Sequence, residues 1–366
     1  MTSANIDQYG RLTPMLAAIE RLVRCESPSD DLQACRQVVG VASEIAKDVL
    51  GKPAVIKEVE ARPVFWWGSE KPRILILAHL DTVWPIGSFH PLWQVEGDVV
   101  RGPGVFDMKA GFVQALYALK GIEGEVALVA TTDEEVGSHS SKALIKELSS
   151  TAEAVLVLEA SLDGKVKTGR KGTAMYQIRV HGLASHAGLE PEKGINATAE
   201  MAHILLSLSG LENSSLGTTV VPTTLHSGTT TNTVPDLAVL DIDVRSFTHE
   251  ELIRVDTAVR GLSTTTPGAR IEVTGGLNRP PLQPSSTAEL YAIAEKVASK
   301  IGMPALGSAE VGGASDGNFA AAAGAKVLDG LGAVGGGAHA ANEWVKLSSI
   351  EERSAFLHAL IKELLA

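Results

Sequence analysis

The stretch RILILAHLD, residues 73–81, carries the strongest signal for the fold class of this chain. Its uninterrupted apolar run is typical of a short strand that is buried on both faces, as in a parallel sheet. The run ends in His79 and Asp81, not in the turn residues that usually follow a strand. Because these residues are two positions apart, their side chains point to the same side of an extended chain. The stretch therefore predicts an α/β fold with polar groups at one edge of its sheet.

Other acidic and histidine residues occupy similar places along the chain, where a predicted strand ends or a glycine-rich loop begins. They are Asp107 in VFDMKAG, Glu134 and Glu135 in ATTDEEVG, Glu159 in LVLEAS, and His339 in GGGAHAANE. Carboxylate oxygens and imidazole nitrogens that converge at the carboxyl edge of one parallel sheet are the ligands that two divalent metals need. We interpret the chain as a two-metal hydrolase.

The chemistry of each residue type suits this interpretation. A metal-bound His79 would donate its other ring N–H to a carboxylate, and Asp81 is placed for that role. The neighbouring Glu134 and Glu135 repel each other unless cations are close, and on an extended chain they face opposite ways. One of them can bind a metal while the other acts as a general base. For each residue taken alone, a turn, a helix cap or a salt bridge is the alternative.

Apolar runs and amphipathic patterns alternate in the first part of the chain and again at its end. They predict strands at 73–78, 126–130, 154–158 and 325–328, and helices at 15–23, 32–50, 108–122, 140–148, 287–300 and 350–365. This alternation is typical of a three-layer α/β domain with a mostly parallel sheet. We assign this domain to residues 1–173 and 278–366.

Between residues 174 and 277 the strands instead alternate apolar and polar residues, as half-exposed strands do. Strands are predicted at 175–180, 237–244 and 270–273, and helices at 196–208 and 250–262. Strands interleaved with two helices predict a small α+β module of ferredoxin-like type, inserted into the first domain.

Composition excludes several classes of protein. The chain has 366 residues and a net charge of −11, whereas a nucleic-acid-binding protein should present a basic face. The two cysteines, Cys25 and Cys35, are expected to be free thiols in a reducing compartment. The first residues show no signal peptide, and no uncharged apolar run reaches the length of about 18 residues that a membrane span needs. A cytoplasmic location is expected.

Two other motifs compete for the glycine-rich region. Gly330, Gly332 and Gly335 form G-x-G-x-x-G after a predicted strand, but no helical pattern follows, which argues against a dinucleotide site. A serine hydrolase using Ser315 (in G-x-S-x-G), Asp329 and His339 is the stronger alternative, because the chain order is that of the α/β-hydrolases. It would leave the carboxylates from Asp107 to Glu159 unexplained.

The chain resembles a family of dizinc hydrolases that includes bacterial glutamate carboxypeptidase, aminoacylases, acetylornithine deacetylase and succinyl-diaminopimelate desuccinylase. The segments that carry the resemblance appear in the family's order: HLDTVWP, GPGVFDMKAG, TTDEEVGS, LEAS, GLASHAG, TNTVPDLAVLDIDVR and GGGAHAANE. GRKG after the Glu159 strand and RPP after the insertion make it most similar to the glutamate carboxypeptidase branch. The match covers nearly the whole chain.

The resemblance implies a role for each candidate ligand. Asp107 would bridge two metals, which are expected to be Zn²⁺, with Co²⁺ or Mn²⁺ as alternatives. His79 and Glu159 would complete one metal site, and Glu135 and His339 the other. The Asp107–Met108 peptide bond is often cis in relatives.

The resemblance also implies the remaining catalytic groups. Glu134 would be the general base and Asp81 would orient His79. His186 in GLASHAG would be the lid histidine, which reaches the active site of the neighbouring subunit and stabilises the oxyanion. The inserted module would then serve as both lid and dimerisation surface, and the protein would be a homodimer.

The resemblance also implies residues that hold the free carboxylate of the substrate, because Asn232, Arg245 and Arg279 sit where relatives hold it. Lys165 and Lys167 are further candidates for the same pocket. Arginine suits this task because its planar fork pairs with both carboxylate oxygens.

The expected reaction is hydrolysis of the amide bond of an N-acyl amino acid, or of a C-terminal amino acid in a short peptide, by a water held between the two metals. A deacylase of the acetylornithine deacetylase type is an alternative. The serine hydrolase and a metal-binding scaffold without activity are more distant ones. No nucleic acid or membrane partner is expected.

Overall fold

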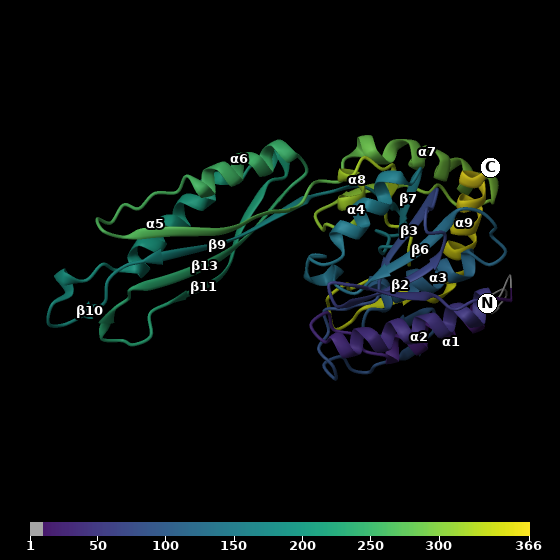
Figure 1. Ribbon diagram of the computed structural model, residues 1–366, viewed down its shortest axis with the longest axis horizontal. Helices are drawn as coiled ribbons and strands as arrows, with labels where there is room; N and C mark the ends of the chain where they lie inside the picture. Colours follow the sequence, from purple (N-terminus) through teal and green to yellow (C-terminus); the bar gives the residue numbers. More distant parts are fainter. Residues whose placement is uncertain (1–9) are drawn as a thin grey trace. The chain divides into compact units, whose positions relative to one another are not determined.

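A computed structural model describes residues 10–366 of the chain (Figure 1). These residues divide into two compact units. The first unit comprises the chain up to Gly169, Gln283–Val311 and Ser315–Ala366, and the second comprises Arg170–Leu282 and Gly312–Ala314. The insertion expected from the sequence, residues 174–277, lies within the second unit.

A six-stranded sheet forms the centre of the first unit. Its order is β1 (Val55–Val59), β2 (Arg62–Gly68), β6 (Val126–Thr131), β3 (Ile74–His79), β7 (Ala154–Val157) and β16 (Val327–Leu328). Strands β6, β3, β7 and β16 are parallel, whereas β1 and β2 extend the sheet in antiparallel fashion. Every residue of β3 and β6 is buried, as expected for strands covered on both faces. The predicted α/β fold with a mostly parallel sheet is confirmed.

Helices cover both faces of this sheet. The main core contains α1 (Leu12–Arg24), α2 (Leu32–Leu50), α3 (Ala110–Ala118), α7 (Pro284–Lys300) and α9 (Leu347–Leu365). On the other side, α4 (Lys142–Thr151) packs against α8 (Asp316–Ala322), which contacts β7 and β16. Figure 1 shows α1 and α2 on one side of the sheet and α4 and α8 on the other. Alternate residues of β3 face the two helical layers, with Ile74 and Ile76 in the main core.

Helix α3 is shorter than the sequence pattern predicts. The predicted helix, 108–122, begins too early, because Asp107 and Met108 have non-helical backbone angles within the π-type turn Val105–Lys109. The helical core therefore starts at Ala110, and the turn before it carries Asp107.

A smaller sheet joins two segments that are far apart in the sequence. Its order is β17 (Gly335–Gly336), β18 (Trp344–Lys346), β5 (Val99–Arg101) and β4 (Gln94–Glu96). Trp344 pairs with Arg101 across the antiparallel ladder. This pairing places the loop before β18 beside the loop after β5. Strands β8 (Val166–Arg170) and β15 (Ser308–Val311) form a separate pair.

The second unit has the predicted ferredoxin-like topology. Its antiparallel sheet has the order β11 (Thr219–Ser227), β13 (Leu237–Ser246), β9 (Gly172–His181) and β14 (Arg270–Arg279). With α5 (Ala197–Leu208) and α6 (His249–Arg260), the chain order is strand, helix, strand, strand, helix, strand. The alternation of β9 and β13 places one row of side chains, including Ile178 and Ile242, in a separate core with both helices.

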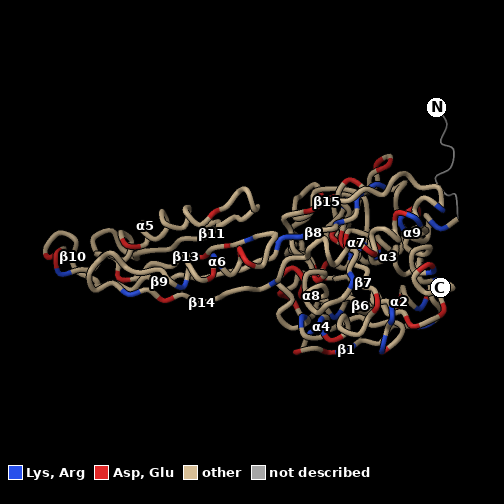
Figure 2. The backbone as a smooth tube through the Cα atoms, turned by 90° about the horizontal axis from the view of Figure 1, so that it is seen from above, with Lys and Arg blue, Asp and Glu red and all other residues tan. Residues whose placement is uncertain are grey.

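Within residues 10–366, every helix is too short or too polar to cross a lipid bilayer. Figure 2 shows acidic and basic residues interleaved along both units.

A buried carboxylate holds part of the second unit together. Glu200, in α5, is fully buried and accepts hydrogen bonds from the backbone N–H groups of Thr265 and Thr266, each at 2.8 Å. The Thr265 hydroxyl donates a third, at 3.0 Å. Burial opposes ionisation of Glu200, but these hydrogen bonds outweigh it and lower its pKa to about 2. The charged carboxylate therefore ties the loop between α6 and β14 to α5.

We expect Glu200→Gln to lower the free energy of unfolding by about 1–3 kcal/mol at pH 7, because three donors lose a charged acceptor. The folded-state pKa is depressed, so the stability from ionised Glu200 is present above its ordinary value of 4.5 and is lost as the pH falls towards 2. The difference between the two proteins should therefore narrow over this range. Urea unfolding followed by circular dichroism at pH 7, 4 and 3 measures it, and a difference independent of pH would contradict this role.

Candidate metal centre

Three neighbouring strands deliver four candidate residues to one edge of the main sheet. His79 is the last residue of β3, Glu134 and Glu135 lie in the short 3₁₀ turn Glu134–Val136 after β6, and Glu159 follows β7. Because β6, β3 and β7 are adjacent and parallel, their carboxyl ends meet at the same edge.

Two further candidates come from loops outside this sheet. Asp107 lies in the turn before α3, and its peptide bond to Met108 is cis. His339 lies between β17 and β18 with a φ of 60°. A left-handed backbone is uncommon for a residue other than glycine, and it is found disproportionately at functional sites.

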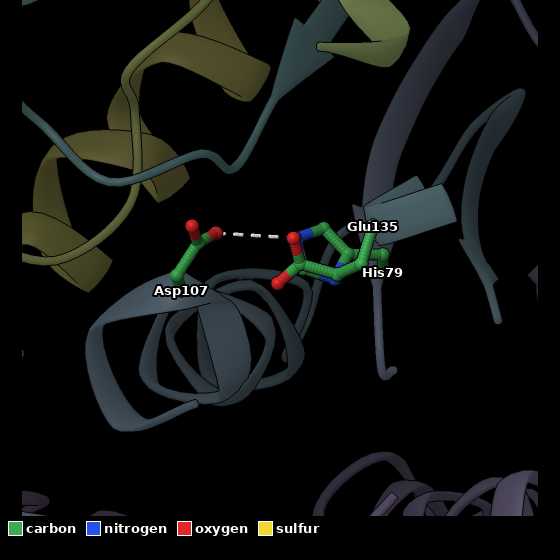
Figure 3. Close-up of side chains that lie close together, drawn as sticks. All are labelled: His79, Asp107 and Glu135. Atoms are coloured by element: carbon green, nitrogen blue, oxygen red, sulfur yellow. Dashed lines mark hydrogen bonds and ion pairs between the residues drawn. The ribbon is translucent and has the colours of Figure 1, made fainter. Parts of the chain in front are cut away.

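The five predicted ligands come together around the Asp107 carboxylate. Asp107 Oδ1 lies 3.2 Å from His79 Nε2, and Asp107 Oδ2 lies 3.5 Å from His339 Nε2. Glu159 Oε1 is 3.8 Å from His79 Nε2, and Glu135 Oε2 is 3.0 Å from His339 Nε2. Figure 3 shows the side chains of His79, Asp107 and Glu135. One potential ligand atom of each lies within 4.8 Å of those of the other two. Each oxygen of Asp107 therefore faces one imidazole, as a carboxylate between two ions does.

The electrostatics of the cluster favour positive charge at its centre. Hydrogen bonds to Asp107 and Glu135 raise the pKa of His339 to about 10. Burial opposes protonation of His79, but hydrogen bonds to Asp107 and Asp81 outweigh it, and its pKa is raised. Burial raises the pKa of Glu135 to about 7. In the metal-free protein, protons on the imidazoles therefore partly neutralise the crowded carboxylates.

This donor set fits divalent metal ions. Two imidazole nitrogens and three carboxylates are ligands that Zn²⁺, Co²⁺ and Mn²⁺ accept in proteins. Metal binding requires neutral imidazoles, so bound cations would replace the charge that the ring protons carry.

Asp81 contacts three of the candidate residues, His79, Glu134 and Glu135. Its carboxylate is completely buried and lies 3.5 Å from His79 Nδ1. It accepts hydrogen bonds from the Ser29 hydroxyl at 2.6 Å and from the backbone N–H groups of Glu134 at 3.4 Å and Glu135 at 3.2 Å. The carboxylate of Asp81 therefore fixes the turn that carries the two glutamates, while its backbone carbonyl, 3.0 Å from His79 Nδ1, holds the histidine ring. Glu134 itself is largely buried.

The remaining catalytic candidate and one substrate candidate are neighbours in the second unit. His186 in β10 (Ser185–His186) pairs with Thr233 of β12 (Thr233–Val234), and the N–H of Ala187 donates to the carbonyl of Asn232 at 2.9 Å. His186 Nδ1 accepts from the N–H groups of Gly188 and Leu189, both at 3.1 Å. In the neutral ring the proton must therefore lie on Nε2.

The other substrate candidates occupy different surroundings. Arg245 forms a two-pronged ion pair with Asp243, at 2.8 and 3.1 Å. Arg279 ends β14 and is buried. Lys165 is exposed and lines a cavity of about 400 Å³ that includes none of the five predicted ligands, while Lys167 is partly buried in β8. Their roles in substrate binding stay predictions.

The surroundings of the two competing motifs contradict both the serine hydrolase and the dinucleotide site. Ser315 is fully buried, caps α8 and donates its hydroxyl to Asp329 at 2.6 Å, while His339 pairs with Glu135 and Asp107. A serine nucleophile would instead need an accessible hydroxyl next to the histidine. The G-x-G-x-x-G segment ends in the short strand β17 and is followed by β18, not by the helix that a dinucleotide site requires.

Sequence reasoning missed Glu343, the last residue of the segment GGGAHAANE. Its buried carboxylate accepts backbone hydrogen bonds from the loop that carries Asp107. The available signal was an acidic residue closing a glycine- and alanine-rich stretch, but nothing in the sequence names its partners. Asp316 was missed too; it accepts hydrogen bonds from Thr131 and Ser138, which flank the glutamate turn.

Known proteins match this chain over most of its length. The family model for peptidase family M20/M25/M40 matches residues 75–363. Carboxypeptidase G2 from Pseudomonas sp. (strain RS-16) is 31% identical over 314 residues, which cover 81% of this chain and 75% of that protein. Succinyl-diaminopimelate desuccinylase from Sulfurovum sp. (strain NBC37-1) is 27% identical over 318 residues, 81% of this chain and 83% of that protein.

A solved structure shares the same fold. The M20 family metallo-carboxypeptidase Sso-CP2 from Sulfolobus solfataricus superposes with a TM-score of 0.75 at 18% identity, covering 96% of this chain and 99% of that one. The sequence match over residues 75–363 includes all five candidate ligands and Glu134. The chain is therefore a member of peptidase family M20/M25/M40, and it is an enzyme of the hydrolase class.

Proposed function

We propose that this enzyme hydrolyses the amide bond between an acyl group and a free amino acid, including the C-terminal amino acid of a short peptide. The observation that carries the proposal is the convergence of His79, His339 and three carboxylates on one point, with Glu134 beside them. The similarity to carboxypeptidase G2 supports a carboxypeptidase-like reaction.

Two divalent metals, Zn²⁺ in our proposal, would be held by Asp107 between them. His79 and Glu159 would complete one position, and Glu135 and His339 the other. When bound, such ions polarise the scissile carbonyl and lower the pKa of a water to about 7. Proton transfer, oxyanion stabilisation and binding of the substrate's carboxylate would be the work of side chains.

Glu134 would be the general base. Its carboxylate takes a proton from the attacking water and later gives it to the nitrogen of the leaving amine. Asp81 contributes by holding the N–H groups of both Glu134 and Glu135, so the base keeps its position next to a metal ligand. Asp81 also orients His79.

His186 would stabilise the oxyanion of the tetrahedral intermediate. The acceptor role of Nδ1 leaves Nε2 to carry the N–H of the neutral ring, and this N–H could donate to the oxyanion. We propose that His186 acts in the neighbouring subunit of a homodimer formed through the second unit, which also serves as a lid.

Arg279 and Asn232 would bind the free carboxylate of the substrate. Arg245 would take part only by sharing its guanidinium with Asp243, since that ion pair already uses two of its nitrogens. Lys165 and Lys167 are secondary candidates in the same role.

An N-acyl amino acid deacylase of the acetylornithine deacetylase type is the second candidate function. The 27% identity to succinyl-diaminopimelate desuccinylase favours it. Both candidates cleave an amide next to a free carboxylate, and they differ in the acyl group that the enzyme prefers.

A panel of substrates tests the function. We expect the metal-loaded enzyme to release free amine from some of the N-acetyl, N-succinyl, N-benzoyl and short peptidyl amino acids. Converting the carboxylate of the best substrate to an amide should lower kcat/KM by about 10–100-fold, because charge-assisted hydrogen bonds are lost. Arg279→Gln should remove most of this discrimination. Equal rates on acid and amide would contradict the carboxylate pocket, and inactivity on the whole panel would contradict the proposed function.

Glu134→Gln tests the general base. The variant keeps the size of the side chain but cannot take the proton, so we expect kcat to fall about 10²–10⁴-fold. Metal content should stay at the wild-type level, because Glu134 is not among the five proposed ligands. Chelator-treated wild-type enzyme should be inactive and should recover with Zn²⁺, Co²⁺ or Mn²⁺. Glu200→Gln, the same substitution at a buried glutamate of the second unit, is the matched control and should leave kcat unchanged. A Glu134→Gln enzyme with the kcat of the wild type would contradict the role of Glu134 as the base.

Subunit complementation tests the role of His186. His186→Ala and Glu134→Gln should each be nearly inactive alone. If His186 serves the neighbouring subunit, a mixed dimer has one site with both native residues, and half of the dimers in an equal mixture are mixed. Activity should therefore return to about a quarter of the wild-type value after subunit exchange. No recovery, despite exchange confirmed by native mass spectrometry, would place His186 in its own subunit's site.

A further inference from the structure

The carboxylate of Glu343 accepts hydrogen bonds from three backbone N–H groups of the loop that carries Asp107. The side chain of Glu343 is 1% exposed. One carboxylate oxygen accepts from the N–H groups of Phe106 at 2.8 Å and Asp107 at 3.0 Å. The other accepts from the N–H of Gly104 at 2.9 Å and from Trp84 Nε1 at 3.2 Å. Four donors therefore surround one carboxylate.

These contacts join the two loops that carry Asp107 and His339. Glu343 follows His339 by four residues, and its own N–H donates to the carbonyl of Ala340 at 2.9 Å, so its backbone is fixed to the turn next to His339. The guanidinium of Arg101 donates to the carbonyl of Asn342 at 3.1 Å, beside the β5–β18 pairing. The side chain of Glu343 thus holds the backbone N–H groups of Gly104, Phe106 and Asp107 together.

The loop that receives Glu343 has little freedom to adjust. Gly104 has a φ of 68°, and a Cβ there would lie 2.5 Å from Thr82 Cγ2. The backbone of Gly104 is thus pressed against Thr82, the residue after Asp81. The carboxylate of Glu343 holds the other side of the same turn, so Asp107 enters the site in one position.

A carboxylate is a costly choice for this task. Burying a charge is unfavourable, and Glu343 adds a negative group next to a cluster that already holds several. A loop that needed only a cap could use a neutral side chain. A charged acceptor gives shorter and stronger hydrogen bonds, and several of them fix a backbone more tightly.

We propose that Glu343 is a positioning residue that sets the spacing between Asp107 and His339, and thereby the affinity of the metal position that these two share with Glu135. This inference rests on the proposed metal centre. The other position depends less on Glu343, because its further ligands, His79 and Glu159, come from strands β3 and β7. The structure thus predicts unequal effects on two neighbouring ions.

Titration of the metal-free enzyme with Zn²⁺, followed by calorimetry, and with Co²⁺, followed by its absorption spectrum, tests the proposal. We expect wild-type enzyme to bind two ions. Glu343→Gln should weaken one of them about 10–100-fold, the usual effect of losing a residue that orients a ligand, and change the other only a few-fold. Its amide keeps one acceptor oxygen but turns an NH₂ group towards backbone donors.

Two further variants make the test specific. Glu200→Gln removes an equally buried carboxylate in the second unit and should bind both ions as wild type does, although it is less stable. Trp84→Phe removes one donor to Glu343 and should give a smaller loss at the same position; it decides the question if Glu343→Gln does not fold.

The outcomes separate this inference from the proposed function. If wild-type enzyme binds two ions and Glu343→Gln lowers the affinity for both equally or for neither, the positioning role is overturned and the proposed function stands. If Glu343→Gln does not fold, unchanged affinity for both ions in Trp84→Phe has the same meaning. Fewer than two ions bound by wild-type enzyme would overturn both.

Discussion

The structure of the site depends on the mutual repulsion of carboxylates that the fold forces together. Asp107, Glu135 and Glu159 lie around two imidazoles, and their carboxylates are largely buried, so water screens their charges less than it would at the surface. Such a group is stable only with positive charge among its members. The pKa values of His79 and His339 are raised, so protons on the two rings supply part of this positive charge. Bound divalent ions would supply more positive charge than these protons do.

A buried frame of hydrogen bonds keeps the ligands in place against this repulsion. Asp81 holds the glutamate turn and the ring of His79, and Glu343 holds the turn of Asp107. Neither would touch a substrate. Both are acidic themselves, so the frame increases the negative charge near the site while it fixes the geometry.

The gathering of the proposed ligands could be predicted from sequence, because these residues are anomalies in an apolar pattern. His79 ends β3 and Glu159 follows β7, at positions where turn residues are usual. The sequence pattern also predicts the helix at 32–50 with its correct bounds. The antiparallel strands β1 and β2 were not predicted. The residues of β1 are mostly exposed, so it lacks the apolar run of a central strand. In β2 an apolar run at 64–67 follows Pro63, and a proline argues against a strand interior.

Glu343 shows a different limit of prediction. Its role follows from the contact of loops more than 230 residues apart, which no local pattern records. Arg245 illustrates the opposite case. Its partner Asp243 is only two residues away, on the same face of β13, so the ion pair could have been foreseen from alternation alone.

The position of His339 beyond the inserted unit has a consequence for how the enzyme is made. With ions bound as proposed, Asp107 and His339 become the ends of a covalently continuous loop that encloses the whole second unit. During synthesis the centre cannot close until that unit has left the ribosome. Once closed, the bound metal links distant parts of the folded chain. Because the ligands separate when the chain unfolds, the ions stabilise the folded state by their binding free energy, unlike a disulfide, which also constrains the unfolded state.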